Sequence, residues 1–262
     1  MRIGSQDEQY TLPRILLIWF AVTLPMGVAY WVIPPMFASG SYETVVMATT
    51  GLTLGLIWQF VLAMIILYQE EGSIGLAAMS RRLWLRLPRN PSTGKASKTL
   101  LWLLVPVCVL FLINMMYVAP PIETFQKSLL PSLQPLPGQS PEVIFSPEVA
   151  DRLVGAWWFF ALFMTLSIFN VFLGEEFIFR GVLLPKMNGV FGRWDWFANG
   201  VLFGLYHVHQ PWTSGGIMLT NGLLLALPAK LFKSIWLSVV PHAIQTIFVF
   251  YMMQGLVRGT LP

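Results

Sequence analysis

Three ionisable side chains lie in an otherwise apolar stretch, residues 174–181 (GEEFIFRG). A charge inside a membrane segment costs roughly 2.5 to 3.5 kcal/mol on insertion scales, so such residues usually face the interior of a helical bundle and perform a task there. In a helix, Glu176 and Arg180 stand at i and i+4, close enough to pair, whereas Glu175 is turned about 100° away. The spacing therefore predicts a structural ion pair beside a Glu175 that is free for chemistry. The alternative is that all three residues mark the watery end of a helix.

The histidines of the chain all follow this stretch and lie within the last three apolar runs: His207, His209 and His242. Helical spacing puts Phe203 one turn before His207, where its ring can support the imidazole, and Gly204 allows a close neighbour. His207 and His209 point to different faces of a continuous helix. We therefore expect one histidine in the bundle interior and His209 at the rim.

One carboxylate and two imidazoles inside a bundle predict either a metal site or an acid–base pair that activates water. A single histidine there is more often a partner in an interhelical hydrogen bond, but three in one region favour a functional cluster. Other hydrolase signatures, HExxH and GxSxG, are absent from the sequence. An aspartyl dyad is excluded as well, because Asp195 is the only aspartate after Asp151.

The elements that must position these residues are membrane helices. The chain has 262 residues, of which 56% are hydrophobic and 11% charged, and its mean hydropathy is +0.67, values outside those of a soluble domain. The sequence predicts an all-α, polytopic transmembrane bundle of about seven spans, with eight as the alternative. The seven apolar runs are 15–33, 44–68, 99–119, 153–174, 194–208, 216–232 and 235–253.

The connections between the runs predict the orientation. The connection 69–98 gathers six basic residues and could form an amphipathic helix over 73–87, whereas the proline-rich connection 120–151 predicts an extended outer loop. With seven spans, thirteen of the sixteen Lys and Arg residues fall on one side of the membrane. The positive-inside rule then predicts a cytoplasmic N-terminus, and we expect a multi-pass protein of the plasma (inner) membrane. The net charge of +4 follows from these loops and indicates no nucleic-acid partner; the lipid bilayer is the expected surrounding.

The ordered motifs Glu175-Glu176-x-x-x-Arg180, Phe203-x-x-x-His207 and the late His242 resemble those of the CAAX-protease and bacteriocin-processing (CPBP, or Abi) family of intramembrane metalloproteases. The resemblance covers roughly residues 153–251, so we divide the chain into N-terminal helices, 1–152, and a catalytic helical core, 153–262. It implies that Glu175 activates the attacking water. It also implies that His207 and His242 either assist Glu175 or bind, together with it, a divalent metal such as zinc.

The sequence departs from the family pattern four residues after His242, where Thr246 replaces an asparagine or aspartate. The family residue is implied to hold the substrate carbonyl or the developing oxyanion. Thr246 lies on the face of His242 and has a hydroxyl donor, while Gln245 at i+3 has a carboxamide. We expect one of the two to supply the missing donor.

Three functions follow from these residues. The leading one is an intramembrane endopeptidase that cuts a membrane-associated protein or peptide, prenylated or not. The second is a catalytically inactive relative that binds a partner in the membrane, for which Thr246 is the main argument. The third is an ion or proton carrier, because intramembrane Glu and His also form relays. Depth is a difficulty for any common site, since His207 would lie about 20 Å along its span and Glu175 nearer the cytoplasmic end of its own.

Overall fold

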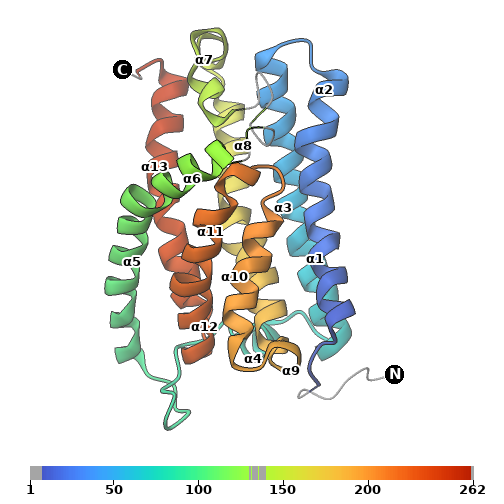
Figure 1. Ribbon diagram of the computed structural model, residues 1–262, viewed down its shortest axis with the longest axis vertical. Coiled ribbons are helices and arrows are strands. Elements are labelled where there is room, and N and C mark those ends of the chain that lie inside the picture. The colour runs from blue at the N-terminus through green and yellow to red at the C-terminus, as the bar shows by residue number, and fades with distance from the viewer. Residues whose placement is uncertain (1–7, 130, 132–134, 136–139, 261–262) are drawn as a thin grey trace.

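The architecture is a bundle of helices, seen in a computed structural model that describes residues 8–129, 131, 135 and 140–260. These residues are 82% helical and form no strand, so the predicted all-α membrane bundle is confirmed. Five helical segments are long and apolar enough to cross a membrane (Figure 1). They are Leu12–Phe37 (α1 and α2), Ser41–Glu71 (α3), Lys98–Leu129 (α5 and α6), Trp157–Lys186 (α8 and its continuation) and Trp236–Arg258 (α13).

Two of the seven expected runs are not full spans. The run 194–208 becomes α10, Asp195–Tyr206, of only 12 residues, and the run 216–232 is a pair of helices, Pro211–Met218 and Gly222–Phe232, bent by 42°. This pair comprises α11 (Ser214–Thr220), a π turn and α12 (Leu227–Phe232). The number of membrane-length spans among the described residues is therefore five, or six if the bent pair counts as one.

The connections differ from the expected ones. The amphipathic helix is only α4, Leu76–Arg82, and the first part of the proline-rich connection is helical as α6, Ala119–Leu129. Pro120 and Pro121 follow the π turn Asn114–Val118 and lie inside the continuous helical segment Lys98–Leu129. Nearer the next span the chain forms α7, Pro147–Leu153.

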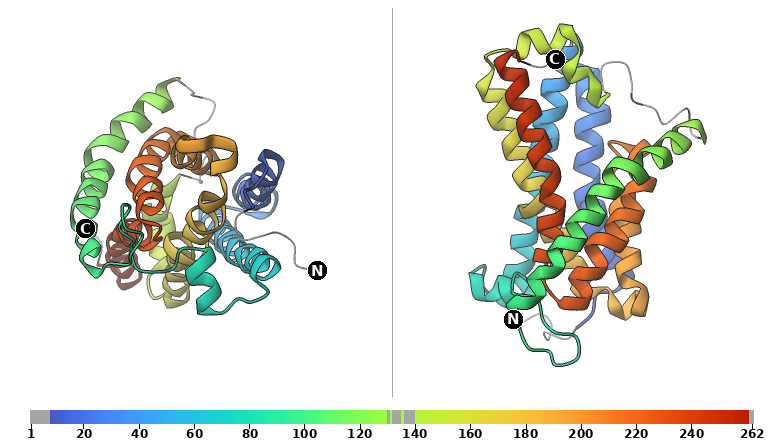
Figure 2. Two further views of the ribbon diagram at one scale, coloured as in Figure 1. Left: turned by 90° about the horizontal axis from the view of Figure 1, so that it is seen from below. Right: turned by 90° about the vertical axis from the view of Figure 1, so that its left-hand side faces the viewer.

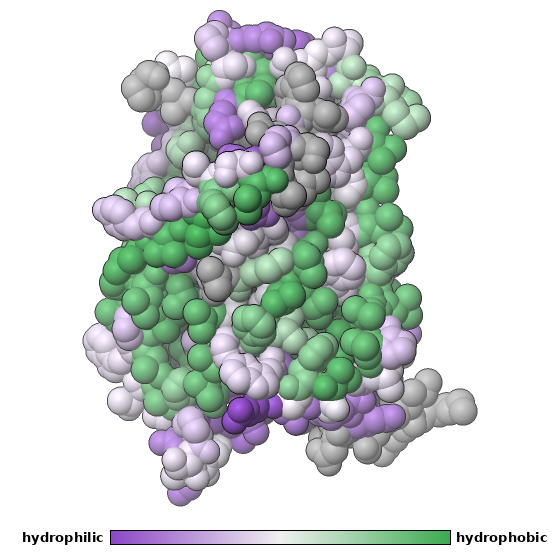
Figure 3. Space-filling model, in the orientation of Figure 1, coloured by the Kyte–Doolittle hydropathy of each residue, from purple (hydrophilic) through white to green (hydrophobic). Residues whose placement is uncertain are grey.

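The surface carries an apolar band around the middle of the bundle with hydrophilic groups at its ends (Figure 3). Large apolar side chains on this surface are exposed, as expected of residues that face lipid: Leu17, Phe20, Trp102, Tyr117, Ile247 and Tyr251 are examples. The basic connection 83–98 and the short α9 (Asn188–Phe191) lie at one end, and the C-terminus and α7 lie at the other (Figure 1). We call these the basic end and the opposite end.

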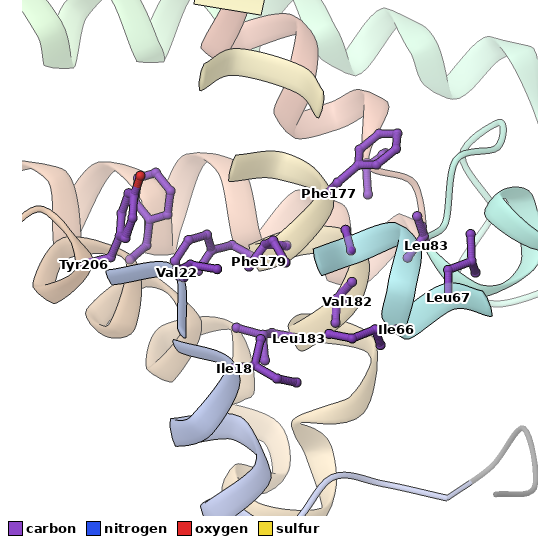
Figure 4. Packing of buried hydrophobic residues seen from close by; sticks show 14 of the residues in the cluster. Ile18, Val22, Ile66, Leu67, Leu83, Phe177, Phe179, Val182, Leu183 and Tyr206 are labelled. Carbon is purple, nitrogen blue, oxygen red and sulfur yellow. The ribbon is translucent and has the colours of Figure 1, made fainter. Parts of the chain in front are cut away.

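The main hydrophobic core lies toward the basic end. It joins residues of α1 and α3 to the segment that follows the glutamate pair and to α10 (Figure 4). Figure 4 labels Ile18, Val22, Ile66, Leu67, Leu83, Phe177, Phe179, Val182, Leu183 and Tyr206 in this core. Every residue from 177 to 184 is buried, so the helix after the glutamate pair is surrounded by protein on all sides.

Arg82, at the end of α4, fastens this helix to the basic end. Its guanidinium donates hydrogen bonds to the carbonyl oxygens of Gly181 and Val182, both at 3.0 Å, and pairs with Glu70 at 2.5 Å. The Tyr10 hydroxyl donates to Glu70 at 2.6 Å, and burial raises the pKa of Tyr10 to about 12, so it remains a donor at neutral pH. These contacts of Arg82, Glu70 and Tyr10 connect α4, α3 and the N-terminal segment to the buried helix at the basic end.

Candidate active site

The glutamate pair lies between two π-helical turns, Phe169–Leu173 and Phe177–Leu183. A π turn accommodates an extra residue within a helix and frequently occurs at functional sites. Gly174 is required at this point because a Cβ atom there would approach the carbonyl oxygens of Phe169 and Leu56 to 2.7 and 2.8 Å. The missing side chain thus lets the segment with Glu175 lie directly against α3.

Glu176 forms the structural pair that the spacing predicts. One of its carboxylate oxygens, Oε1, lies 3.2 Å from Arg180 Nη1, and both side chains are fully buried. The same oxygen accepts a hydrogen bond from Nδ1 of His242 at 2.9 Å. The Arg180 guanidinium also lies 4.3 Å from the centre of the Phe203 ring. Glu176 therefore links the cation of its own helix to a histidine of α13.

Glu175 has polar partners but is not the partner of an ion pair within its own helix. With its amide nitrogen turned toward the carboxylate, Asn170 donates to both Glu175 oxygens, at 2.9 and 2.8 Å. The Tyr206 hydroxyl also interacts with this carboxylate and accepts a hydrogen bond from Gln59 at 2.7 Å. His242 Nε2 lies 3.9 Å from Glu175 Oε2. Neutral groups thus hold the Glu175 carboxylate in place beside the His242 imidazole.

His207 follows the last residue of α10. Its Nδ1 lies 2.8 Å from the carbonyl oxygen of Phe203, which can only accept a hydrogen bond, so Nδ1 carries the proton and neutral His207 presents a lone pair on Nε2. The Phe203 ring lies 4.8 Å from the imidazole in an edge-to-face contact, as the one-turn spacing predicts. Gly204 is also needed, because a Cβ there would come within 2.9 Å of the Ser214 carbonyl oxygen.

The expected position of His209 at the rim is wrong. Its side chain is buried, and its ring lies 5.2 Å from that of His207 and 6.2 Å from that of Tyr30. The reason is that α10 ends at Tyr206, so the two histidines do not follow helical geometry and their rings come together. Its Nδ1 has no hydrogen-bond partner among the described residues.

An open cavity of about 520 Å³ joins these residues. Its walls include the carboxylate, the two histidines of the motifs and polar groups beside them: Glu175, His207, His242, Asn170 and Gln245. Helices from both halves of the chain form the walls, with Met26 from α1 and Phe111 from α5 among them. The expected mismatch in depth does not arise, because Glu175 and His207 line the same cavity.

Gln245 and Thr246 differ in their access to this cavity. Gln245 lines the wall next to His242, whereas Thr246 is not part of the lining. The Thr246 hydroxyl oxygen is buried and has no hydrogen-bond partner among the described residues. Of the two candidate donors, only the carboxamide is placed to reach a substrate.

The side chains do not fit a metal centre with three protein ligands. Within the described ranges, no group of three His, Cys, Asp or Glu side chains is placed to hold a metal ion. His242 directs Nδ1 to Glu176 and His207 directs Nδ1 to a backbone carbonyl. We therefore derive no catalytic step from a metal.

Some polar groups of the site could not be identified from the sequence. Asn170 is a carboxamide within an apolar run, and that is the one signal that could have drawn attention to it. Its contact with Glu175 depends on the π turn, which ordinary helical spacing does not reveal. Tyr206 and Gln59 carry no motif.

Residues 156–248 match the sequence profile of the family described as type II CAAX prenyl endopeptidase Rce1-like. The match covers about a third of the chain and contains both glutamates, Arg180 and the histidines of the cavity. No curated protein and no solved structure matches the chain. Residues 156–248 are thus similar to this family, and the match supports the resemblance to CAAX proteases that the motifs indicate.

Proposed function

We propose that this protein is an intramembrane endopeptidase in which Glu175 activates water to hydrolyse a peptide bond. The observation that carries the proposal is the placement of the Glu175 carboxylate 3.9 Å from His242 Nε2 in the wall of an open cavity. A carboxylate within reach of a bound water is a general base, and the apolar surroundings strengthen its interactions with developing charge.

In the proposed reaction, Glu175 takes one proton from the water while its oxygen attacks the substrate carbonyl carbon. The carbonyl oxygen becomes an oxyanion, to which the Gln245 carboxamide donates a hydrogen bond. The C–N bond then breaks as Glu175 returns the proton to the leaving nitrogen. Asn170 orients the carboxylate throughout, because it donates to both oxygens.

In the proposed reaction, His242 lies beside Glu175 with a fixed orientation. Its hydrogen bond to Glu176 keeps the proton on Nδ1 and leaves Nε2 directed at Glu175, an arrangement in which a carboxylate fixes the tautomer of a catalytic imidazole. His207 presents its Nε2 lone pair to the same cavity and can accept a hydrogen bond from the water or from the substrate N–H.

A comparison of protein termini in membranes tests the proposal. Cells that carry the wild type are compared at matched expression with cells that carry Glu175→Gln, and Glu148→Gln serves as a control because Glu148 is exposed outside the cavity. New termini with the wild type and the control, but not with Glu175→Gln, are expected, and they would identify the substrate. Identical termini, with the Glu175 variant folded and inserted, would contradict proteolysis.

The second candidate is an inactive scaffold that binds a membrane partner. It is favoured by the position of Thr246, which does not reach the cavity where the family pattern has a donor. A scaffold retains its partner in the Glu175→Gln variant, and a protease loses its products, so the same experiment separates the two.

A further inference from the structure

The cavity extends from the catalytic residues toward the opposite end only. Its walls include the first turn of α3, the C-terminal half of α13 and the residue before the 3-10 turn Pro141–Phe145, through Thr44, Met252 and Ser140. No residue of the basic connection 83–98 and none from 176 to 202 lines it. On the basic side, the buried helix 177–183 and the Arg82 network separate the cavity from solvent.

Among the described residues that line the cavity, the side chains that can carry a charge near neutral pH are glutamates and histidines. Glu123 of α6 and Glu175 line the cavity, and no lysine or arginine is among its described lining residues. Glu123 is half-buried, and no ion pair involves it among the described residues. Lys127, one turn further along α6, lies close enough to influence it but does not line the cavity. A low-dielectric cavity with this composition attracts cations and repels anions.

This composition is unfavourable for a CAAX tail. Such a tail ends in a carboxylate only three residues after the prenylated cysteine, so cleavage next to that cysteine brings the terminal anion into the site. Burying an anion without a partner is strongly unfavourable, and two carboxylates in the walls increase the penalty.

Resting on the proposed function, we propose that the cavity receives a peptide segment from the end opposite the basic loops and that Glu123 pairs with a cationic side chain of that segment. The substrate class is then a membrane peptide that carries Lys or Arg near the cleaved bond and is presented at the opposite end. By the positive-inside rule that end is extracytoplasmic. Glu123 is a specificity-determining residue in this proposal and takes no part in the water attack.

Cysteine labelling tests entry and charge preference without relying on proteolysis. The full chain carries Cys108→Ser, which removes its one cysteine, and either Thr49→Cys in the cavity wall or Ser92→Cys in the exposed basic connection. Sealed vesicles that shield Ser92→Cys are treated with two membrane-impermeant methanethiosulfonates, trimethylammonium-ethyl and sulfonatoethyl. The rates at Thr49→Cys are divided by those at Ser92→Cys in opened vesicles, which corrects for the intrinsic reactivity of each reagent.

We expect Thr49→Cys to react in vesicles that shield Ser92→Cys, and the cationic reagent to react faster than the anionic one after correction. Glu123→Gln should lower this preference about three- to tenfold, whereas Glu148→Gln should leave it unchanged. Reaction only from the face of the basic loops, or from neither face, would overturn the proposed entry. An unchanged preference in Glu123→Gln would overturn the role of Glu123. Neither result depends on whether Glu175 catalyses hydrolysis.

Discussion

His242 Nδ1 lies 2.9 Å from Glu176 Oε1, so the glutamate that pairs with Arg180 also directs an imidazole of the cavity. The two adjacent glutamates therefore have different tasks. Glu176 holds two buried groups, Arg180 and His242, and Glu175 faces the space where a substrate is expected. Their separation arises because consecutive residues of a helix point in different directions.

Glu176→Gln should destabilise the protein, because it leaves the Arg180 cation fully buried without its carboxylate. Breaking a buried pair by removing one partner costs about 3–5 kcal/mol. Adding Arg180→Met should recover much of the thermal stability in detergent but not proteolysis, since His242 still lacks the group that orients it. A double variant that is as active as the wild type would contradict the positioning role of Glu176.

Gln245→Ala should lower kcat by about 10² to 10³, the usual effect of removing one oxyanion donor, with little change in KM. The neighbouring Thr246→Val is the matched control. It replaces a buried hydroxyl that has no partner among the described residues, so the variant should keep full activity and equal or slightly higher stability. Initial rates on the substrate identified by its new termini measure both, and a loss confined to Thr246→Val would reverse the assignment.

Gly174→Ala should impair folding, because the added methyl group would meet two backbone carbonyl oxygens at 2.7 and 2.8 Å. Overpacking of this kind typically costs about 1–3 kcal/mol, and rigid backbone neighbours place the change at the upper end. Gly75→Ala is the control: its φ is −71°, and the nearest atom to an added Cβ is the Ser73 hydroxyl oxygen at 3.4 Å. Thermal unfolding should separate the two variants, and equal melting temperatures would show that α3 and the motif helix can move apart.

Chelation with 1,10-phenanthroline should leave the proteolytic rate within about twofold of its untreated value, because the described side chains form no group of three metal ligands. A zinc protease treated in parallel confirms that the chelator is active. Loss of activity that zinc restores would show that the cavity assembles a metal centre on binding substrate.

Spacing in the sequence predicted those parts of the site that regular helices place. The Glu176–Arg180 pair and the contact of Phe203 with His207 follow directly from i, i+4 geometry. The departures come where the helices are not regular. His209 joins His207 because α10 stops at Tyr206.

The long apolar runs predicted the membrane bundle because about 20 apolar residues are what a span requires. They did not predict the short α10 or the bent pair after it, since a helix buried in protein need not reach either membrane surface. The apolar runs did not predict the cavity either. Its walls combine Met26, Phe111 and Gln245, residues from distant segments that no local pattern connects.

The π turns on either side of Gly174 have a consequence for how the reactive carboxylate is encoded. In an α-helix, residues five apart diverge by roughly 140° around the axis, yet Asn170 and Glu175 meet because the wider winding of residues 169–173 accommodates one more residue. Removing a single apolar residue from this turn would leave every charge and every motif intact. It would nevertheless rotate Glu175 by about 100° relative to the preceding span, away from the amide that holds it. The site thus depends on the length of the segment before the motif as strictly as on the motif itself.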